Sequence, residues 1–190
     1  LRDPVGDVLP SRAAHEGAGC VAWASCGCPE WGSVGAGCAV GGSVAIVDSL
    51  GTVGQWTSLA LDGTGKPIIS YLDATNSALK VVHCDIADCS DGQSQNSVIT
   101  DNAGDVGSWS SLALDAAGNP VISYYDATND TNGDLKVVHC DIYSCADGQF
   151  SYSVDTDGIV GSYTSLVLDG AGNPVISYYD ASNRNLKLRH

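Results

Sequence analysis

Basic residues are scarce in this chain of 190 residues, which holds eight Lys and Arg against 22 Asp and Glu. The formal net charge is −14, and a chain this acidic repels phosphate backbones and anionic lipid head groups. Binding to nucleic acid is therefore not expected. Apolar runs all fall short of the roughly 20 residues that a membrane-spanning helix needs, so membrane insertion is not expected either.

Catalytic signatures are also lacking. No Gly-rich phosphate loop leads into a helix, and no Ser, His and acidic residue are spaced as a catalytic group. Ser58, Ser111 and Ser165 fall inside expected strands. The sequence thus predicts a protein that is not an enzyme.

Methionine is absent, and the chain begins at Leu1. The charged and then apolar pattern of an export signal is missing as well. We therefore expect a processed or truncated chain whose export signal has been removed.

Cysteine, by contrast, is abundant, with eight residues. Two C-x4-C pairs recur at equivalent places, and each is either a zinc half-site or a local disulfide. Zinc would need two further ligands in each repeat, and the histidine before each pair would point to the opposite face of a strand. Disulfides are therefore predicted, and with them an extracellular or cell-surface location. The two pairs are Cys84 with Cys89 and Cys140 with Cys145.

The remaining cysteines lie in a Gly-rich, irregular stretch near the N-terminus. Two disulfides among them would stiffen a segment that has little core of its own. Metal binding is the alternative, although thiolates separated by one residue are not the usual zinc spacing. The four residues are Cys20, Cys26, Cys28 and Cys38, and their pairing stays open.

The chain repeats itself three times. Residues 56–62 return as residues 109–115 and again as 163–169, at offsets of 53 and then 54 residues. A period of this length with several short strands is typical of a propeller or another stacked repeat array.

Each repeat is expected to form four short strands. Val, Ile, Tyr and Thr fill the strands, while Asp, Asn and Gly fill the turns. Four hairpin-linked strands make one blade of a β-propeller, and a β-solenoid, whose coils are usually shorter, is the alternative. In the second repeat the expected strands are 110–114, 121–125, 135–139 and 151–155, with loops at 126–134 and 140–145.

In each of the three repeats, one Asp-x-x-Gly turn separates the first two strands. The Asp can accept backbone N–H groups across the turn, and the Gly can take a positive φ. These Asp residues are therefore expected to be structural. They are Asp62, Asp115 and Asp169.

Residues 119–126 and 173–180 read NPVISYYD after a Gly. This period resembles the blades of secreted bacterial β-propeller proteins with repeats of the form SLALD-x-x-GNPVISYYDATNGDLK. The resemblance covers residues 43–190 and implies an exported propeller used for binding or assembly. The turn is also loosely similar to the Asp-box of sialidases, but the Ser and Trp of that box and an arginine cluster are not matched, so sialidase activity is not expected.

The repeats divide the chain into a Cys- and Gly-rich segment, 1–42, and three propeller-type repeats, 43–96, 97–150 and 151–190. Part of the first segment resembles a decayed preceding repeat. Residues 43–48 align with the fourth strands of later repeats, and the third repeat stops before its own. Either this N-terminal strand acts as a clasp that completes the last blade, or the chain is a window on a longer repeat protein.

Propellers typically have about four to eight blades, so three repeats predict an incomplete ring or one closed by another chain. Exposed strand edges also favour pairing between chains, as in a homo-oligomer or a filament.

One polar loop is a candidate calcium site. It offers several carboxylate and amide oxygens around one Gly, and Ca²⁺ prefers such oxygen ligands. A polar hairpin loop without metal is the alternative. The candidate ligands are Asp126, Asp130, Asn132 and Asp134.

Trp56, Trp109 and Tyr163 open the first strand of each repeat. Aromatic residues at this position can stack on sugar rings, or they can pack between blades. The histidines that precede the paired cysteines recur in the same way, as packing residues or as ligands of an axial metal.

Together these features predict a non-catalytic extracellular protein for binding, adhesion or assembly, with itself, the rest of a longer chain or glycans as partners. The alternatives are a lectin-like propeller and the propeller part of a larger secreted hydrolase.

Overall fold

The computed structural model describes residues 44–90, 97–129, 132–146 and 149–190. All belong to one compact unit, Ser43–His190. Within these ranges the chain forms eleven β-strands and no helix, so the all-β prediction is confirmed. The four N-terminal cysteines and Asp130 lie outside the described residues.

The strands form three antiparallel sheets, and the fourth strands of the first two sheets, residues 97–101 and 149–155, extend past the predicted repeat boundaries at 96 and 150. The first sheet contains β1 (Val53–Leu61), β2 (Pro67–Asp73), β3 (Ala78–His83) and β4 (Ser97–Asp101), in that order. The second has the same order, with β5 (Val106–Leu114), β6 (Pro120–Asn129), β7 (Asn132–Cys140) and β8 (Gln149–Asp155). The third has three strands, β9 (Val160–Leu168), β10 (Pro174–Asp180) and β11 (Asn185–Arg189), with β10 in the middle.

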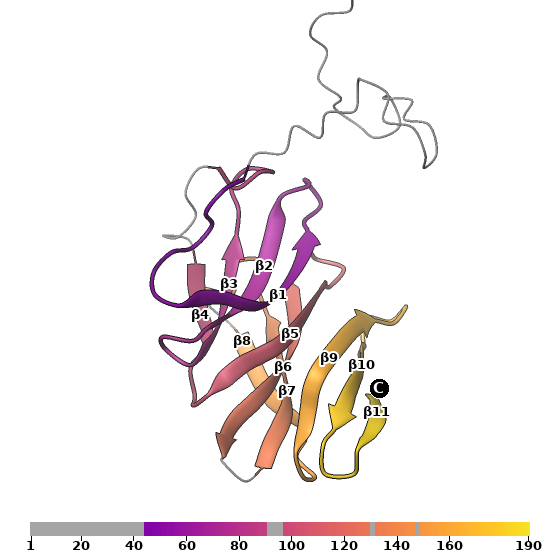
Figure 1. Cartoon of the computed structure of the whole chain (residues 1–190). Coiled ribbons are helices and arrows are strands. Elements are labelled where there is room, and N and C mark those ends of the chain that lie inside the picture. The colour runs from indigo at the N-terminus through magenta and orange to yellow at the C-terminus, as the bar shows by residue number, and fades with distance from the viewer. Residues whose placement is uncertain (1–43, 91–96, 130–131, 147–148) are drawn as a thin grey trace, which may run out of the picture. The chain divides into compact units, whose positions relative to one another are not determined.

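The second sheet lies between the other two (Figure 1). Its first strand, β5, contacts both β1 and β9. The first strands of the three sheets are therefore neighbours, and the same face-to-face contact occurs twice along the chain.

Each Asp-x-x-Gly turn forms because the Asp carboxylate accepts hydrogen bonds from backbone N–H groups of the turn. The Asp62 side chain accepts the N–H groups of Thr64 at 2.8 Å and Lys66 at 2.9 Å, and Gly65 takes a φ of 83°. The Lys66 N–H, followed by the His83 side chain and the Thr64 hydroxyl, holds the pKa of the Asp62 carboxyl well below its ordinary value. The predicted structural role of this Asp therefore agrees with its contacts.

Apolar side chains fill the two spaces between sheets. The first space contains Ile68, Leu79 and Val81 of the first sheet, all fully buried. Full burial of each such side chain contributes about 1.5–3 kcal/mol. They face residues of the second sheet, namely Val106, Leu112, Ile122, Tyr124 and Val138. The second space repeats this pattern with Val121, Leu135 and Val137 against Val160, Leu166, Ile176 and Tyr178.

The predicted loop 126–134 is wrong in extent. Strand β6 continues to Asn129 and β7 begins at Asn132, and these two residues pair. The extra residues of this repeat lengthen a hairpin, because antiparallel strands continue to exchange backbone hydrogen bonds beyond Asp126. The first strand of this repeat is also longer than predicted and begins at Val106.

Candidate functional site

The contact between sheets depends on a repeated carboxylate bridge. Asp101, at the end of β4, belongs to the first sheet but reaches the second. Its Oδ2 accepts the Tyr124 hydroxyl at 2.6 Å and lies 2.8 Å from the Lys136 Nζ. Asp155 of the second sheet makes the same bridge to Tyr178 and Lys187 of the third.

The charges of this bridge are stabilised by one another. Burial is the largest effect on Asp101 and raises its pKa, but the hydrogen bonds from Lys136, Tyr124 and the Ala103 N–H together lower the pKa below its ordinary value. Burial, followed by the hydrogen bond to Asp101, raises the pKa of Tyr124. The bridge is therefore an ionised, desolvated pair with a neutral phenol, suited to joining sheets.

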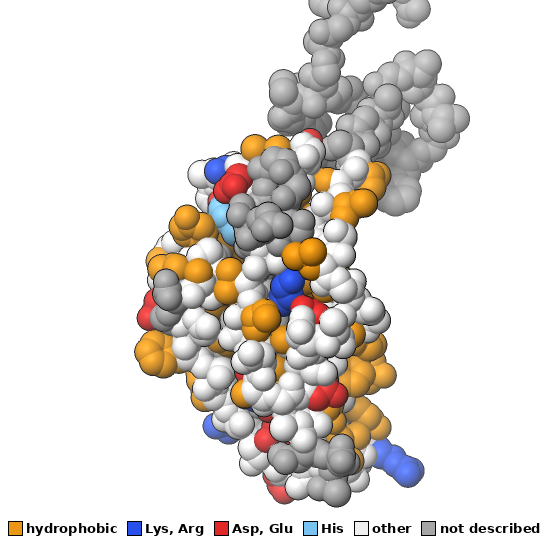
Figure 2. Space-filling view, turned by 90° about the vertical axis from the view of Figure 1, so that its left-hand side faces the viewer, with side chains coloured by type: hydrophobic (Ala, Val, Ile, Leu, Met, Phe, Trp, Pro, Cys, Tyr) orange, Lys and Arg blue, Asp and Glu red, His pale blue; other side chains and the backbone are white. Residues whose placement is uncertain are grey.

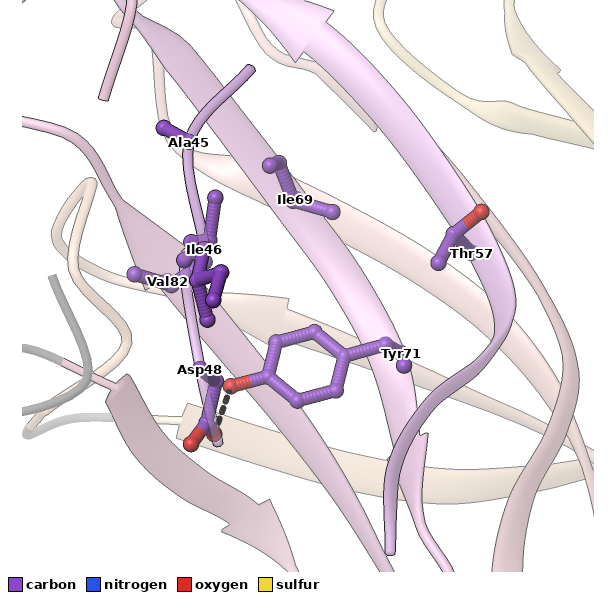
Figure 3. A pocket seen from close by; sticks show the side chains of 9 residues that line it. Ala45, Ile46, Asp48, Thr57, Ile69, Tyr71 and Val82 are labelled. Atoms are coloured by element: carbon purple, nitrogen blue, oxygen red, sulfur yellow. Dashed lines mark hydrogen bonds between the residues drawn. The ribbon is translucent and has the colours of Figure 1, made fainter. Parts of the chain in front are cut away.

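A third bridge uses residues that precede the first sheet. Asp48 accepts the Tyr71 hydroxyl at 2.6 Å and lies 2.6 Å from the Lys80 Nζ (Figure 3). Residues 44–48 are called here the 44–48 segment. This segment contacts the first sheet through Asp48 in the same way as the end of β4 contacts the second sheet through Asp101. The segment occupies the position of a fourth strand in front of the first sheet.

A cavity of about 310 Å³ lies between the 44–48 segment and the first sheet. In Figure 3 the side chains of Ile69, Tyr71 and Thr57 come from the sheet, while Ala45, Ile46 and Asp48 come from the segment. The Tyr71–Asp48 hydrogen bond is a polar contact in a largely apolar lining. The full lining is Ala45, Ile46, Val47, Asp48, Gly54, Thr57, Ile69, Tyr71 and Val82.

Serine and threonine hydroxyls connect the first strands of neighbouring sheets. Ser110 donates to the Trp56 carbonyl at 2.7 Å, and Ser58 accepts the Leu112 N–H at 3.0 Å. Thr164 and Ser111 repeat these two bonds between the second and third sheets, at 2.9 and 3.0 Å. These hydroxyls therefore hold sheets together.

The three predicted stacking residues form one aromatic column. The ring centroids of Trp56 and Trp109 are 4.9 Å apart, and those of Trp109 and Tyr163 are 5.1 Å apart. Trp109 is packed between its neighbours, as the packing alternative predicts. The outer rings keep open surface, because Trp56 is 44% and Tyr163 66% exposed.

Each recurring histidine binds the Asp of its own turn. The Nε2 atoms of His83, His139 and His190 lie 2.9 Å from Oδ2 of Asp62, Asp115 and Asp169 respectively. This contact ties the turn to the third strand of the same sheet.

The candidate calcium ligands are only partly described. Asp126 accepts the N–H of Thr128 at 2.9 Å and also its hydroxyl, and its Oδ2 lies 3.4 Å from the Lys136 Nζ. Burial, followed by the negative charge of Asp126, raises the pKa of Asp134. Among the described residues, no group of three or more His, Cys, Asp or Glu is arranged to hold a metal ion. Because Asp130 is outside those residues, calcium binding stays a prediction.

Two disulfides close the loops that follow β3 and β7. They join Cys84 to Cys89 and Cys140 to Cys145, with sulfur–sulfur distances of 2.03 and 2.01 Å. All four cysteines are buried, and Cys140 and Cys145 belong to the apolar cluster between the first and second sheets.

Sequence reasoning missed the apolar faces of the outer sheets. Leu186 is 80% exposed and Leu188 is 69% exposed, whereas the equivalent Leu79 and Val81 are fully buried. Figure 2 shows exposed hydrophobic side chains on the face that it draws. Aligning each repeat with the other two would have marked these positions as members of an interface.

No family model and no curated protein matches the chain. One solved structure, a fucose lectin from Kordia zhangzhouensis in complex with methyl-fucoside, is similar over 70% of this chain and 89% of that chain. The TM-score is 0.44 and the sequence identity 18%, a likeness too low to indicate what this chain binds. In the described part of the chain, no helix has the length and apolarity to span a membrane.

Proposed function

We propose that this chain is a non-catalytic extracellular protein for binding, adhesion or assembly, in which propeller-type sheets stack through a repeated interface. One observation carries the proposal. The bridge between sheets, made by Asp101 with Tyr124 and Lys136, recurs with Asp155, and Asp48 makes the same contacts from the 44–48 segment to the first sheet. An interface repeated at this fidelity is suited to joining further copies of the same unit.

Strand order supports the propeller-type arrangement. The two full sheets each contain four antiparallel strands in sequence order, and their first strands are neighbours. Propeller blades have four such strands, with the sheets packed around a common axis. Parallel coils, as in a β-solenoid, would pair strands differently.

The bonds made by reactive side chains support a role without catalysis. The Ser58 and Ser111 hydroxyls accept backbone N–H groups of the neighbouring sheet. The carboxylates of Asp62 and Asp101 are held in turns and bridges. In this proposal, these side chains therefore have a structural role in joining turns and sheets.

The disulfides support an extracellular location, because such bonds form and persist in oxidising compartments. The same compartment suits a protein that associates with surfaces or with itself.

Light scattering after size-exclusion chromatography tests the proposal with the oxidised 190-residue chain over a wide concentration range. We expect particles larger than a monomer, which dissociate on dilution. A monomer at every concentration that also leaves a glycan array blank would contradict the proposal.

A second candidate is a carbohydrate-binding surface on the aromatic column. The exposed rings of Trp56 and Tyr163 favour it, since aromatic faces can stack on sugars. A glycan array would test it with Tyr163→Ala and with the control Tyr152→Ala, which removes a 49% exposed ring outside the column. Loss of a signal in the first variant alone would support this candidate.

A further inference from the structure

Each contact between sheets has two complementary halves. The leading half, on the first of the two sheets, contributes Leu79 and Val81. The receiving half, on the next sheet, contributes Leu112 and Ile122. The second sheet carries both halves and buries both, because it lies between the other two.

The third sheet keeps an open leading half. Leu186 and Leu188 on β11 are 80% and 69% exposed, and Val167 on β9 is 60% exposed. At the equivalent positions of the second sheet, Leu135 and Val137 are fully buried. The third sheet thus exposes the apolar residues that the first two sheets bury against the next sheet.

The first sheet keeps an open receiving half. Leu59 is 57% exposed, while the equivalent Leu112 and Leu166 are 8% and 5% exposed. Ile69 and Thr57 of the same half line the cavity in Figure 3 rather than contact another sheet.

A Gly near the start of the first strand of each sheet shows how closely the preceding sheet approaches. A Cβ on Gly107 would lie 2.8 Å from the Leu79 Cα, and one on Gly161 would lie 2.7 Å from the Leu135 Cα. A Cβ on the equivalent Gly54 would meet nothing within 4 Å. The space that Leu79 and Leu135 fill in the two internal contacts is therefore open in front of Gly54.

The 44–48 segment already lies at this open face, in the position that a fourth strand takes in the complete sheets. In the complete sheets, the fourth strand supplies the Asp that bridges to the next sheet, as Asp101 does. The 44–48 segment supplies Asp48 to the first sheet, and β11 is an edge strand of the third sheet. A third sheet placed on the first would thus bring β11 beside the segment.

We infer that the third sheet of one copy binds the first sheet of a second copy, and that residues 44–48 of the second copy pair with β11 as its fourth strand. This inference rests on the assembly version of the proposed function and names its partner. Leu186 would then fill the space in front of Gly54, as Leu79 fills the space in front of Gly107.

The internal sheets set the pairing. On β3 and β4, Leu79 pairs with Asp101 and Val81 with Val98, and β7 and β8 repeat this register. Alignment on the bridging Asp therefore pairs Leu186 with Asp48 and Leu188 with Ala45. Because the two faces differ, the contact is head-to-tail, and it closes as a ring or grows as a filament.

The first experiment measures the association of Leu188→Asp by light scattering. The variant would bury an unpaired carboxylate, so the dissociation constant should rise about 100-fold. Phe150→Asp is the matched control, since Phe150 is 66% exposed on β8, away from both open faces. Circular dichroism verifies that both variants fold.

The second experiment mixes Ala45→Cys protein with Leu188→Cys protein under mild oxidation. Residues directly opposite on paired strands have Cβ atoms about 4.5–5.5 Å apart, within reach of a disulfide. Peptide mass spectrometry should find a disulfide between the two copies, and a Phe150→Cys partner should give none.

The outcomes separate the two proposals. Larger particles that Leu188→Asp leaves intact, or that give no link between positions 45 and 188, would overturn the inference and leave the proposed function standing. A wild-type chain that stays monomeric would overturn the inference as well, and a glycan signal from that monomer would keep the binding version of the function.

Discussion

The Oδ2 of Asp101 on β4 lies 2.6 Å from the hydroxyl of Tyr124 on β6, so the last strand of one sheet is bonded to the second strand of the next. Asp101 is 8% exposed and Tyr124 fully buried. The bond joins residues 23 apart in sequence and fixes the spacing of two sheets. Its loss should affect the whole unit, since the sheets share their apolar core.

Replacement of Asp101 by Ala should lower the free energy of unfolding by about 3 kcal/mol. The change leaves the Lys136 ammonium buried without its main partner, and such a loss is strongly destabilising. Urea unfolding followed by circular dichroism measures it. Asp141→Ala, at an exposed position, is the control, and an equal effect of both variants would contradict the structural role of the bridge.

Stability should fall in acid. Burial raises the pKa of Asp101 and Asp155, but their hydrogen bonds to Lys and Tyr outweigh this effect and hold both values below the ordinary range. A lowered pKa in the folded state stabilises the fold above the ordinary Asp pKa of about 3.9, and this contribution is lost as the pH falls through the folded value. Chemical unfolding across this pH range should show the loss, and Asp101→Asn should make it shallower. If the free energy of unfolding of Asp101→Asn depended on pH as steeply as that of the wild type, the attribution to Asp101 would be wrong.

Gly107→Ala should destabilise the chain more than Gly54→Ala. Both positions have positive φ, 100° and 87°, and an L side chain there costs about 1–2 kcal/mol. At Gly107 the new Cβ also meets the backbone of Leu79 at 2.8 Å, and such overpacking adds about 1–3 kcal/mol. Melting temperatures of the two variants, compared under conditions in which the wild type is monomeric, test the difference. Equal losses of melting temperature in the two variants would show that the contact with the Leu79 backbone adds no cost at Gly107.

Replacement of Cys84 and Cys89 together by Ser should lower the free energy of unfolding by about 2 kcal/mol, the chain-entropy value for so short a loop. The double variant is preferable to a reductant, because the second disulfide, Cys140–Cys145, then stays intact. Thermal unfolding measures the effect. An unchanged melting temperature would show that buried packing, not the covalent link, holds this loop.

The sequence by itself predicted the elements because each carries a local signal. The recurrence of residues 56–62, the Asp-x-x-Gly turns and the Pro residues that begin β2, β6 and β10 all depend on neighbours within a few positions. The same locality explains the error at 126–134, where polar residues looked like a loop although the hairpin continues to Asn129.

Only the tertiary structure decided which groups meet across the sheets. The bonds of Asp101 to Tyr124 and of Ser110 to Trp56 join residues 23 and 54 apart, and no spacing rule specifies which carboxylate reaches which phenol. An alignment of the repeats marks Leu188 and Val81 as equivalent positions of an interface, but it does not show which of the two is covered in the folded chain. Burial depends on what the fold places opposite a side chain, and that distinguishes Val81, fully buried, from Leu188, 69% exposed.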